Sequence, residues 1–192
     1  MVSTSLKDYL KTFNVFTEAE MDDFSDIAVP VTIRKSDYFI KEGEVCNRVV
    51  FVLSGILRSY YISDKHNEIT YCITFPNQLM TAYSSYLTSQ PTHENIQAVA
   101  TTQLLVFSKE KVVKLARHNM HWTFFLKTIA EQQYIELEKR IVQLQKSDAT
   151  QRYVDLISNH PEYIQKIPLQ YLASYLGISQ RHLSRIRKDV SF

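Results

Sequence analysis

The sequence predicts an α+β protein: an N-terminal antiparallel β-roll or jelly roll with flanking helices, then a long helix, then a small C-terminal helix-turn-helix domain. Three features predict this fold: short β-rich runs fill residues 29–108, an apolar stripe lies within residues 121–145, and two amphipathic segments meet at a glycine near the end. The chain has 192 residues, of which 45% are hydrophobic and 22% are charged. This balance is typical of a globular protein and allows one large core or two small ones.

Residues 1 to about 28 are predicted to be helical. Leu6, Leu10 and Phe13 follow a helical spacing, and Thr17 with Glu20 has the pattern of a capping box at the start of a second helix. The N-terminal segment is polar and lacks the apolar run of a signal peptide, and no stretch approaches the roughly 18 apolar residues of a membrane helix. We therefore expect a cytoplasmic protein with no membrane partner.

The next region, residues 29–108, consists of short runs rich in Val, Ile, Tyr and Phe, many of which alternate apolar with polar residues. Many short strands at close spacing are typical of a small antiparallel barrel or roll. Gly43 and Gly55 fall between runs, where hairpin or corner turns are needed. The expected strands are 31–33, 37–40, 49–53, 56–62, 69–74, 96–100 and 104–107.

The few glycines, cysteines and histidines exclude several classes of chemistry. Three glycines in the whole chain cannot form a Gly-rich phosphate-binding loop. Cys46 and Cys72 alone cannot build a disulfide framework, a zinc site or an iron–sulfur cluster, and Cys72 is expected to be buried in an apolar strand. Cupin-type enzymes on a β-roll need a close His pair, a carboxylate and a third His, whereas His66 and His93 are isolated. We therefore predict no enzymatic activity and no metal site.

From Ser108 onward the sequence is predicted to be helical, with a long helix from about 121 to 145. Apolar residues within it are spaced four and three apart, and charged residues flank them. Two interpretations stay open: the stripe packs on the β domain, or it is the seam of a parallel homodimer. The seam residues would be Ala130, Tyr134, Leu137, Ile141 and Leu144.

The segment from 168 to 189 carries the pattern of a helix-turn-helix. Two helices that cross closely need a small residue in the first helix and a glycine in the turn, which Ala173 and Gly177 supply. Ser179 is well placed to cap the second helix. Apolar residues are available to seal the inner face, namely Leu172, Leu176, Ile178, Leu183 and Ile186.

The outward face of the second helix is basic. The chain as a whole has a net charge of only +2, but residues 178–189 contain four basic residues and one acidic residue. Such side chains contact base edges and phosphates in the major groove of duplex DNA. The alternative is a solvated helical hairpin with a basic surface. The expected DNA-binding residues are Ser179, Gln180, Arg181, His182, Ser184, Arg185, Arg187 and Lys188, and since the sequence stops at Phe192 we expect no long wing after them.

Together, the N-terminal helix, a β-roll with Glu42–Glu44 and Leu53–Gly55, the heptad helix and the terminal helix-turn-helix resemble the Crp/Fnr family of bacterial transcription regulators. The run from Lys166 to Lys188 is similar to the ending of Bacteroidetes-type members, which lack a full wing. The resemblance covers nearly the whole chain. It implies a cyclic-nucleotide-binding-like effector domain over 1–120, a dimerisation helix over 121–146 and a DNA-binding helix-turn-helix domain over 147–192.

The resemblance also implies function and partners. A homodimer would bind palindromic double-stranded DNA under the control of a small-molecule effector in the roll, with RNA polymerase as a further partner. Gln180, Arg181 and Arg185 match the positions of the family's base readers. The alternative is a ligand-sensing module of the cyclic-nucleotide-binding type without DNA binding, against which the basic face argues.

The effector site departs from the family pattern. Cyclic-nucleotide binders carry a Gly-Glu pair for the ribose and an Arg-Ser/Thr pair for the cyclic phosphate, but Thr81-Ala82 and Thr92-His93 take those places here. A buried cyclic phosphate needs a cation or several amide donors. We therefore predict that cAMP binding is lost or weak, and that no cofactor is bound. The region is rich in aromatic residues, and a pocket for a planar or apolar ligand would be walled by Thr81, Ala82, Tyr83, Thr92, His93, Gln133, Tyr134 and Leu137.

Haem is an open alternative, since members of the family use it and His66, His93, His118 or His121 could serve as an axial ligand. Each of these histidines is also consistent with an ordinary surface side chain.

Overall fold

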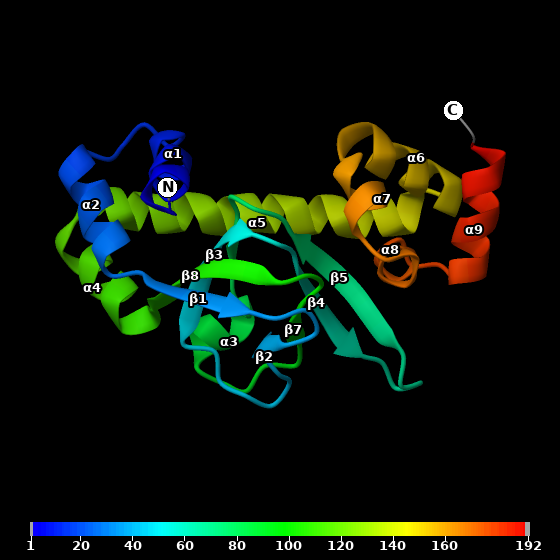
Figure 1. Ribbon diagram of the computed structural model, residues 1–192, viewed down its shortest axis with the longest axis horizontal. Coiled ribbons are helices and arrows are strands. Elements are labelled where there is room, and N and C mark those ends of the chain that lie inside the picture. Colours follow the sequence, from blue (N-terminus) through cyan, green and yellow to red (C-terminus); the bar gives the residue numbers. More distant parts are fainter. Residues whose placement is uncertain (1, 191–192) are drawn as a thin grey trace. The chain divides into compact units, whose positions relative to one another are not determined.

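The computed structural model describes residues 2–190, with the side chains of 5–117 and 119–190 (Figure 1). The chain divides into two compact units. Unit 1 comprises Met1–Ser59 and Ile73–Ile129, and unit 2 comprises Tyr60–Cys72 and Ala130–Phe192.

Two four-stranded sheets form the predicted jelly roll, and the pairs β1–β8, β2–β7, β3–β6 and β3–β8 are antiparallel. The α+β fold class is thereby confirmed. The first sheet has the order β1 (Val29–Ile33), β8 (Thr102–Ser108), β3 (Arg48–Ser54), β6 (Leu79–Met80). The second has the order β2 (Tyr38–Ile40), β7 (Asn95–Ala98), β4 (Leu57–Ile62), β5 (Glu68–Thr74), and the outer ends of β4 and β5 belong to unit 2.

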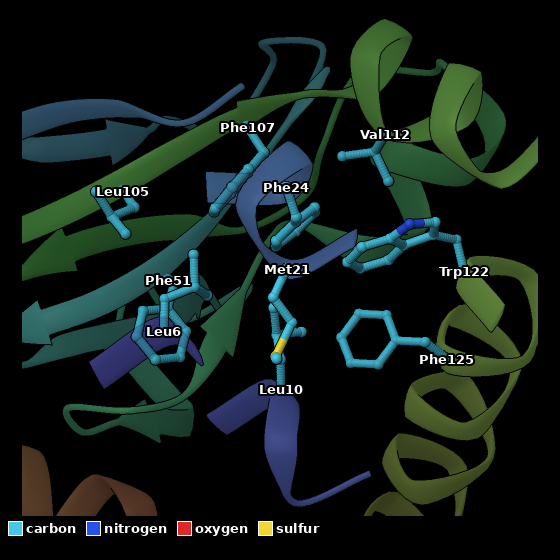
Figure 2. Packing of buried hydrophobic residues seen from close by; sticks show 10 residues of the cluster. All are labelled: Leu6, Leu10, Met21, Phe24, Phe51, Leu105, Phe107, Val112, Trp122 and Phe125. Atoms are coloured by element: carbon cyan, nitrogen blue, oxygen red, sulfur yellow. The ribbon is translucent and has the colours of Figure 1, made fainter. Parts of the chain in front are cut away.

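The hydrophobic core of unit 1 lies between one face of the first sheet and four helices. These are α1 (Val2–Lys11), α2 (Glu18–Asp26), α4 (Lys109–His118) and the start of α5 (Met120–Lys146). The Phe24 ring stacks on Phe107 with 4.3 Å between centroids and on Trp122 with 4.7 Å. Large buried aromatic rings contribute most of the apolar area in such a core. Figure 2 shows its ten buried residues: Leu6, Leu10, Met21, Phe24, Phe51, Leu105, Phe107, Val112, Trp122 and Phe125.

Local capping signals set several helix starts, including the one predicted at Thr17. Thr17 and Glu20 form a complete capping box at α2, because each side chain bonds the backbone N–H of the other. Ser108 caps α4, and Asp148 caps α6 (Ala149–Asn159).

Gly55 is required by the turn between β3 and β4. Its φ is +85°, and a Cβ atom there would lie 2.6 Å from the carbonyl oxygen of Thr101. Glycine is therefore needed both for the left-handed backbone and for the close approach of another chain segment.

The second half of α5 in unit 2 is joined by α6, α7 (Glu162–Lys166), α8 (Leu169–Tyr175) and α9 (Gln180–Asp189). The core of this unit buries Leu172 and Ala173 from α8 with Leu183 and Ile186 from α9. Arg152 is buried as well; its Nε donates to the carbonyl oxygen of Leu176 at 3.1 Å and its Nη1 to that of Ser147. A buried guanidinium thus satisfies carbonyl groups at the ends of two helices.

Three short elements and one burial state differ from the expectation. No local pattern predicts β6, α7 or α3 (Tyr83–Thr88), and the N-cap of α3, Ala82, has no side chain able to cap it. Cys72 is half-buried rather than buried. The reason is that β5 is an outer strand of its sheet, so a neighbouring strand covers it on one side only. Within residues 2–190, no helix combines the length and apolar character needed to cross a membrane.

Candidate nucleic-acid interface and effector region

The turn between α8 and α9 is a Schellman motif. The N–H of Ile178 donates to the carbonyl of Ala173, and the N–H of Gly177 donates to that of Ser174, both at 3.0 Å. Gly177 has a φ of +70°. This backbone favours glycine and satisfies the last carbonyl groups of α8, so the direction of α9 is fixed by local hydrogen bonds.

Ser179 caps the start of α9, as the sequence predicted. Its backbone is extended and its Oγ accepts a hydrogen bond from the N–H of His182 at 3.2 Å. Leu183 and Ile186 are buried on the inner face of the helix. The predicted DNA-contacting side chains lie elsewhere on the helix: Gln180, Arg181, Arg185, Arg187 and Lys188 are exposed, and His182 and Ser184 are half-buried.

The cationic face is electrostatically available. Within the described residues, no carboxylate forms an ion pair with Arg181, Arg185 or Arg187. Solvated guanidinium groups on one helix attract phosphate and can also donate to base edges.

The start of the turn is held by α5. The Arg140 guanidinium carbon lies 3.9 Å from the centroid of the Tyr175 ring, and its Nη2 donates to the Tyr175 carbonyl. Burial raises the pKa of Tyr175, although the positive charge of Arg140 opposes that shift. The Tyr163 ring lies 5.5 Å from that of Tyr175, and burial raises the pKa of Tyr163 as well. This buried pair therefore stays neutral in its packing role.

A second support comes from the hairpin formed by β4 and β5. Ser174 Oγ donates to the carbonyl of Glu68 and accepts from the N–H of Thr70, both at 2.8 Å. The sequence does not reveal this contact, because its partners are 104 and 106 residues apart. Nothing in the local pattern around Ser174 distinguishes it from a surface serine.

The predicted seam residues lie along α5, and most of them are exposed. Tyr134 is 67% exposed and Leu137 is 55% exposed; Ile141 and Leu144 are exposed, and Ala130 is half-buried. A contiguous stripe of exposed apolar side chains on one helix is typical of a protein interface.

The residues that align with the family's cyclic-nucleotide site make hydrogen bonds within the chain. Thr81 Oγ1 donates to the carbonyl of Arg48 at 2.8 Å. Thr92 is buried; its N–H donates to the Glu44 carbonyl at 2.8 Å, and its Oγ1 accepts from the N–H of Glu94 at 3.2 Å. Both hydroxyl groups therefore already have partners in the protein.

The other predicted wall residues are distributed over both units. Ala82 is buried at the start of α3, Tyr83 is exposed on α3, and His93 is exposed in the loop before β7. Gln133, with Tyr134 and Leu137, is exposed on the part of α5 that belongs to unit 2.

The histidines considered for haem have separate surroundings. His66 sits in a turn with a φ of +58°, and His121 Nδ1 lies 2.8 Å from Glu20 Oε1. The side chain of His118 lies outside the described residues. Among the residues that are described, no three His, Cys, Asp or Glu side chains are grouped so as to hold a metal ion.

The Glu20 carboxylate is the most strongly shifted acid near these histidines. Partial burial raises its pKa, but hydrogen bonds from the backbone of Thr17 and from the side chains of Asn119, His121 and Thr17 outweigh burial and lower the pKa to about 2. The group is a structural anion that ties α2 to the start of α5.

Comparison with known proteins agrees with the geometry of unit 1. Residues 30–119 match the family model of the cyclic nucleotide-binding domain. The matched region spans β1 to the end of α4 and includes the segments that carry Thr81 and Thr92. Among proteins with curated descriptions, none matches the sequence.

Solved structures share the fold over most of the chain. FixK2 from Bradyrhizobium japonicum has a TM-score of 0.76 and 17% identity, with 85% of this chain and 84% of that chain covered. The c-di-GMP responsive global regulator CLP of Xanthomonas campestris has a TM-score of 0.73 and 14% identity over 91% of each chain. A putative Crp/Fnr family regulator of Eubacterium rectale has a TM-score of 0.71 and 20% identity, covering 95% and 87%. At these identities the similarity concerns the fold.

Proposed function

We propose that this protein is a cytoplasmic, sequence-specific DNA-binding transcription regulator of the Crp/Fnr type, regulatory rather than catalytic. The main support for this proposal is the exposed basic face of α9. The opposite face of this helix is buried, and its start is fixed by Gly177 and Ser179. Arg181 and Arg185 donate to base edges, with Gln180 beside them, and Arg187 neutralises a phosphate. The structural similarity to a putative transcriptional regulator of the Crp/Fnr family from Eubacterium rectale supports the same proposal.

The protein acts as a homodimer paired along α5 through the exposed stripe that includes Tyr134 and Leu137. Two copies related by a twofold axis would present two α9 helices to successive turns of a palindromic operator. Leu137→Glu places a charge in this seam and should convert the dimer to a monomer in analytical ultracentrifugation. Glu138→Lys, an exposed position beside the seam, is the matched control.

The effector is a small molecule other than cAMP, and RNA polymerase is the expected protein partner at the promoter. The proposed effector pocket comprises Thr81, Ala82, Tyr83, Thr92 and His93, all in unit 1. We expect weak cAMP binding for two reasons. The hydroxyl groups of Thr81 and Thr92 already form hydrogen bonds within the chain. In addition, neither position supplies a cation for the cyclic phosphate.

The test is the salt dependence of DNA affinity, measured by fluorescence anisotropy on a duplex selected from random sequence. A true binder loses affinity steeply as salt rises, because bound phosphates release counterions. Arg187→Ala should weaken binding to all duplexes and reduce the slope of log affinity against log salt by about one. Lys35→Ala removes the same charge from an exposed position in unit 1 and should leave the slope unchanged. Absence of binding, or binding that ignores salt, would instead favour a ligand-sensing module without DNA binding.

A further inference from the structure

A pocket of about 340 Å³ lies in unit 1, where both sheets of the roll have an outer strand. Residues of β1, at the edge of the first sheet, and of β2, at the edge of the second, both line it. None of the residues that align with the cyclic-nucleotide site lines this pocket. It is therefore a separate cavity of the same domain.

One wall of the pocket is a flat apolar surface formed by β1 and β8. The register places Val29 opposite Val106 and Val31 opposite Leu104, and all four side chains line the pocket. Val29 is 52% exposed and Val31 is 38% exposed. Apolar surface left in water forgoes about 25 cal/mol per Å² of burial free energy, so an apolar ligand laid along this wall is stabilised.

The polar part of the pocket carries positive charge. Arg48 at the start of β3 and Lys111 in the first turn of α4 both line it, and both are exposed. Arg48 is held over the Phe39 ring, with its guanidinium carbon 5.1 Å from the centroid and its Nη2 donating to the Phe39 carbonyl at 3.4 Å. Two cations on separate elements thus line the same apolar cavity.

No negative charge in the described residues neutralises this pair. No Asp or Glu lines the pocket, and neither Arg48 nor Lys111 forms an ion pair within the described part of the chain. Ser108 also lines the pocket and caps α4, whose N-terminus adds a partial positive charge. The combination is complementary to a ligand with an anionic head and an apolar tail.

We propose that this pocket binds an amphipathic carboxylate of the medium-chain fatty acid class. The carboxylate lies between Arg48 and Lys111, and the acyl chain lies along Val29, Val31 and Val106. The volume of about 340 Å³ is near the lower end of the range of about 300–1,000 Å³ for ligand pockets, which favours a small, slender ligand. The proposal is independent of DNA binding.

The experiment is isothermal titration of the full chain with decanoate below its micellar concentration. We expect saturable binding of one molecule per chain. Decanol, which has the same tail without the charge, should bind at least about tenfold more weakly, as expected for the loss of charge-assisted hydrogen bonds. Hexanoate, with the same head and a shorter tail, should also bind more weakly. Equal affinity for decanol and decanoate, or no saturable heat with decanoate, would overturn the proposal.

Variants locate the site. Arg48→Gln and Lys111→Gln should each weaken decanoate binding by about tenfold, whereas Lys35→Gln, an exposed lysine that does not line the pocket, should have no effect. Val31→Arg places a charge on the apolar wall and should abolish binding. Unchanged affinity in Arg48→Gln and Lys111→Gln would place the ligand elsewhere. Flotation with phosphatidylglycerol vesicles distinguishes a free fatty acid from a lipid surface as the ligand. If the ligand is a free fatty acid, the protein should not associate with the vesicles. Vesicle association that is lost in Arg48→Gln and Lys111→Gln would instead identify a lipid surface as the ligand.

Discussion

The outward face of α9 and the segment from Thr81 to His93 differ in where their polar groups are directed. On α9, Arg181, Arg185 and Arg187 extend into solvent above a buried apolar face. In the other segment, the hydroxyl groups of Thr81 and Thr92 bond to the backbone of the same chain. The first surface is available to a partner, whereas the second uses its polar groups to hold the roll together.

Gly177→Val should disturb the α9 surface more than any other single substitution proposed for it. A β-branched residue held at a φ of +70° costs about 3 kcal/mol, the upper part of the range for strained backbone, and removes the preferred geometry of the α8–α9 turn. Urea unfolding, monitored by circular dichroism, should show this loss of stability. Fluorescence anisotropy should show loss of DNA binding. Gly177→Asn, which tolerates the left-handed region, should lose less; equal losses in the two variants would show that the turn does not depend on its backbone conformation.

Arg185→Ala should cost about 1–3 kcal/mol of binding to the selected duplex and relax specificity at one base pair in each half-site. The fold should be unaffected, because the side chain is exposed. Competition binding against duplexes mutated at single positions measures the effect, with Lys35→Ala as the charge-matched control. A uniform loss at every position would assign Arg185 to the phosphates instead.

Thr92→Val tests whether the hydroxyl group of Thr92 stabilises the roll. It removes the acceptor for the N–H of Glu94 and should destabilise the fold by about 0.5–1.5 kcal/mol, with no change in DNA affinity. Thr92→Ser keeps the hydroxyl and should lose less stability. If Thr92→Val unfolds with unchanged stability, the hydroxyl has no structural role and the segment is better viewed as a ligand surface.

Glu20 lies outside both regions and gives the smallest effect. Its pKa is lowered from 4.5 to about 2, so its contribution to stability is present above its ordinary pKa and is lost as pH falls toward 2. The effect is modest because the group is partly solvated. As pH falls between these values, the unfolding temperature of Glu20→Gln should decline less than that of the unaltered protein. An identical decline would assign the acid sensitivity to other carboxyl groups.

The start of α9 could be predicted from the sequence because it depends on residues close together in the chain. The contacts of the roll depend on residues far apart and were less predictable. Thr17 with Glu20, Ser108, Asp148 and Ser179 act on backbone groups within three residues, so their roles follow from the sequence pattern. The bond between Ser174 and Glu68 joins residues 106 positions apart, and no short-range pattern encodes it.

The missed elements have the same cause. The N-cap of α3 is Ala82, which lacks a capping side chain, and β6 is two residues long. The pocket at β1 and β2 depends on which strands occupy the sheet edges, which follows from the roll's long-range pairing. The positive charge of Arg48 and Lys111 therefore could not be assigned to one cavity before the strands were placed.

The most direct test of the α9 surface is selection of bound duplex from a random-sequence pool, followed by sequencing. We expect enrichment of a twofold-symmetric site whose half-sites lie about 10–10.5 base pairs apart or at a multiple of that spacing. The same selection with Arg181→Ala/Arg185→Ala should lose the symmetric site. Enrichment of one and the same sequence by both proteins, or of none by the unaltered protein, would contradict the assignment of α9 as the recognition helix.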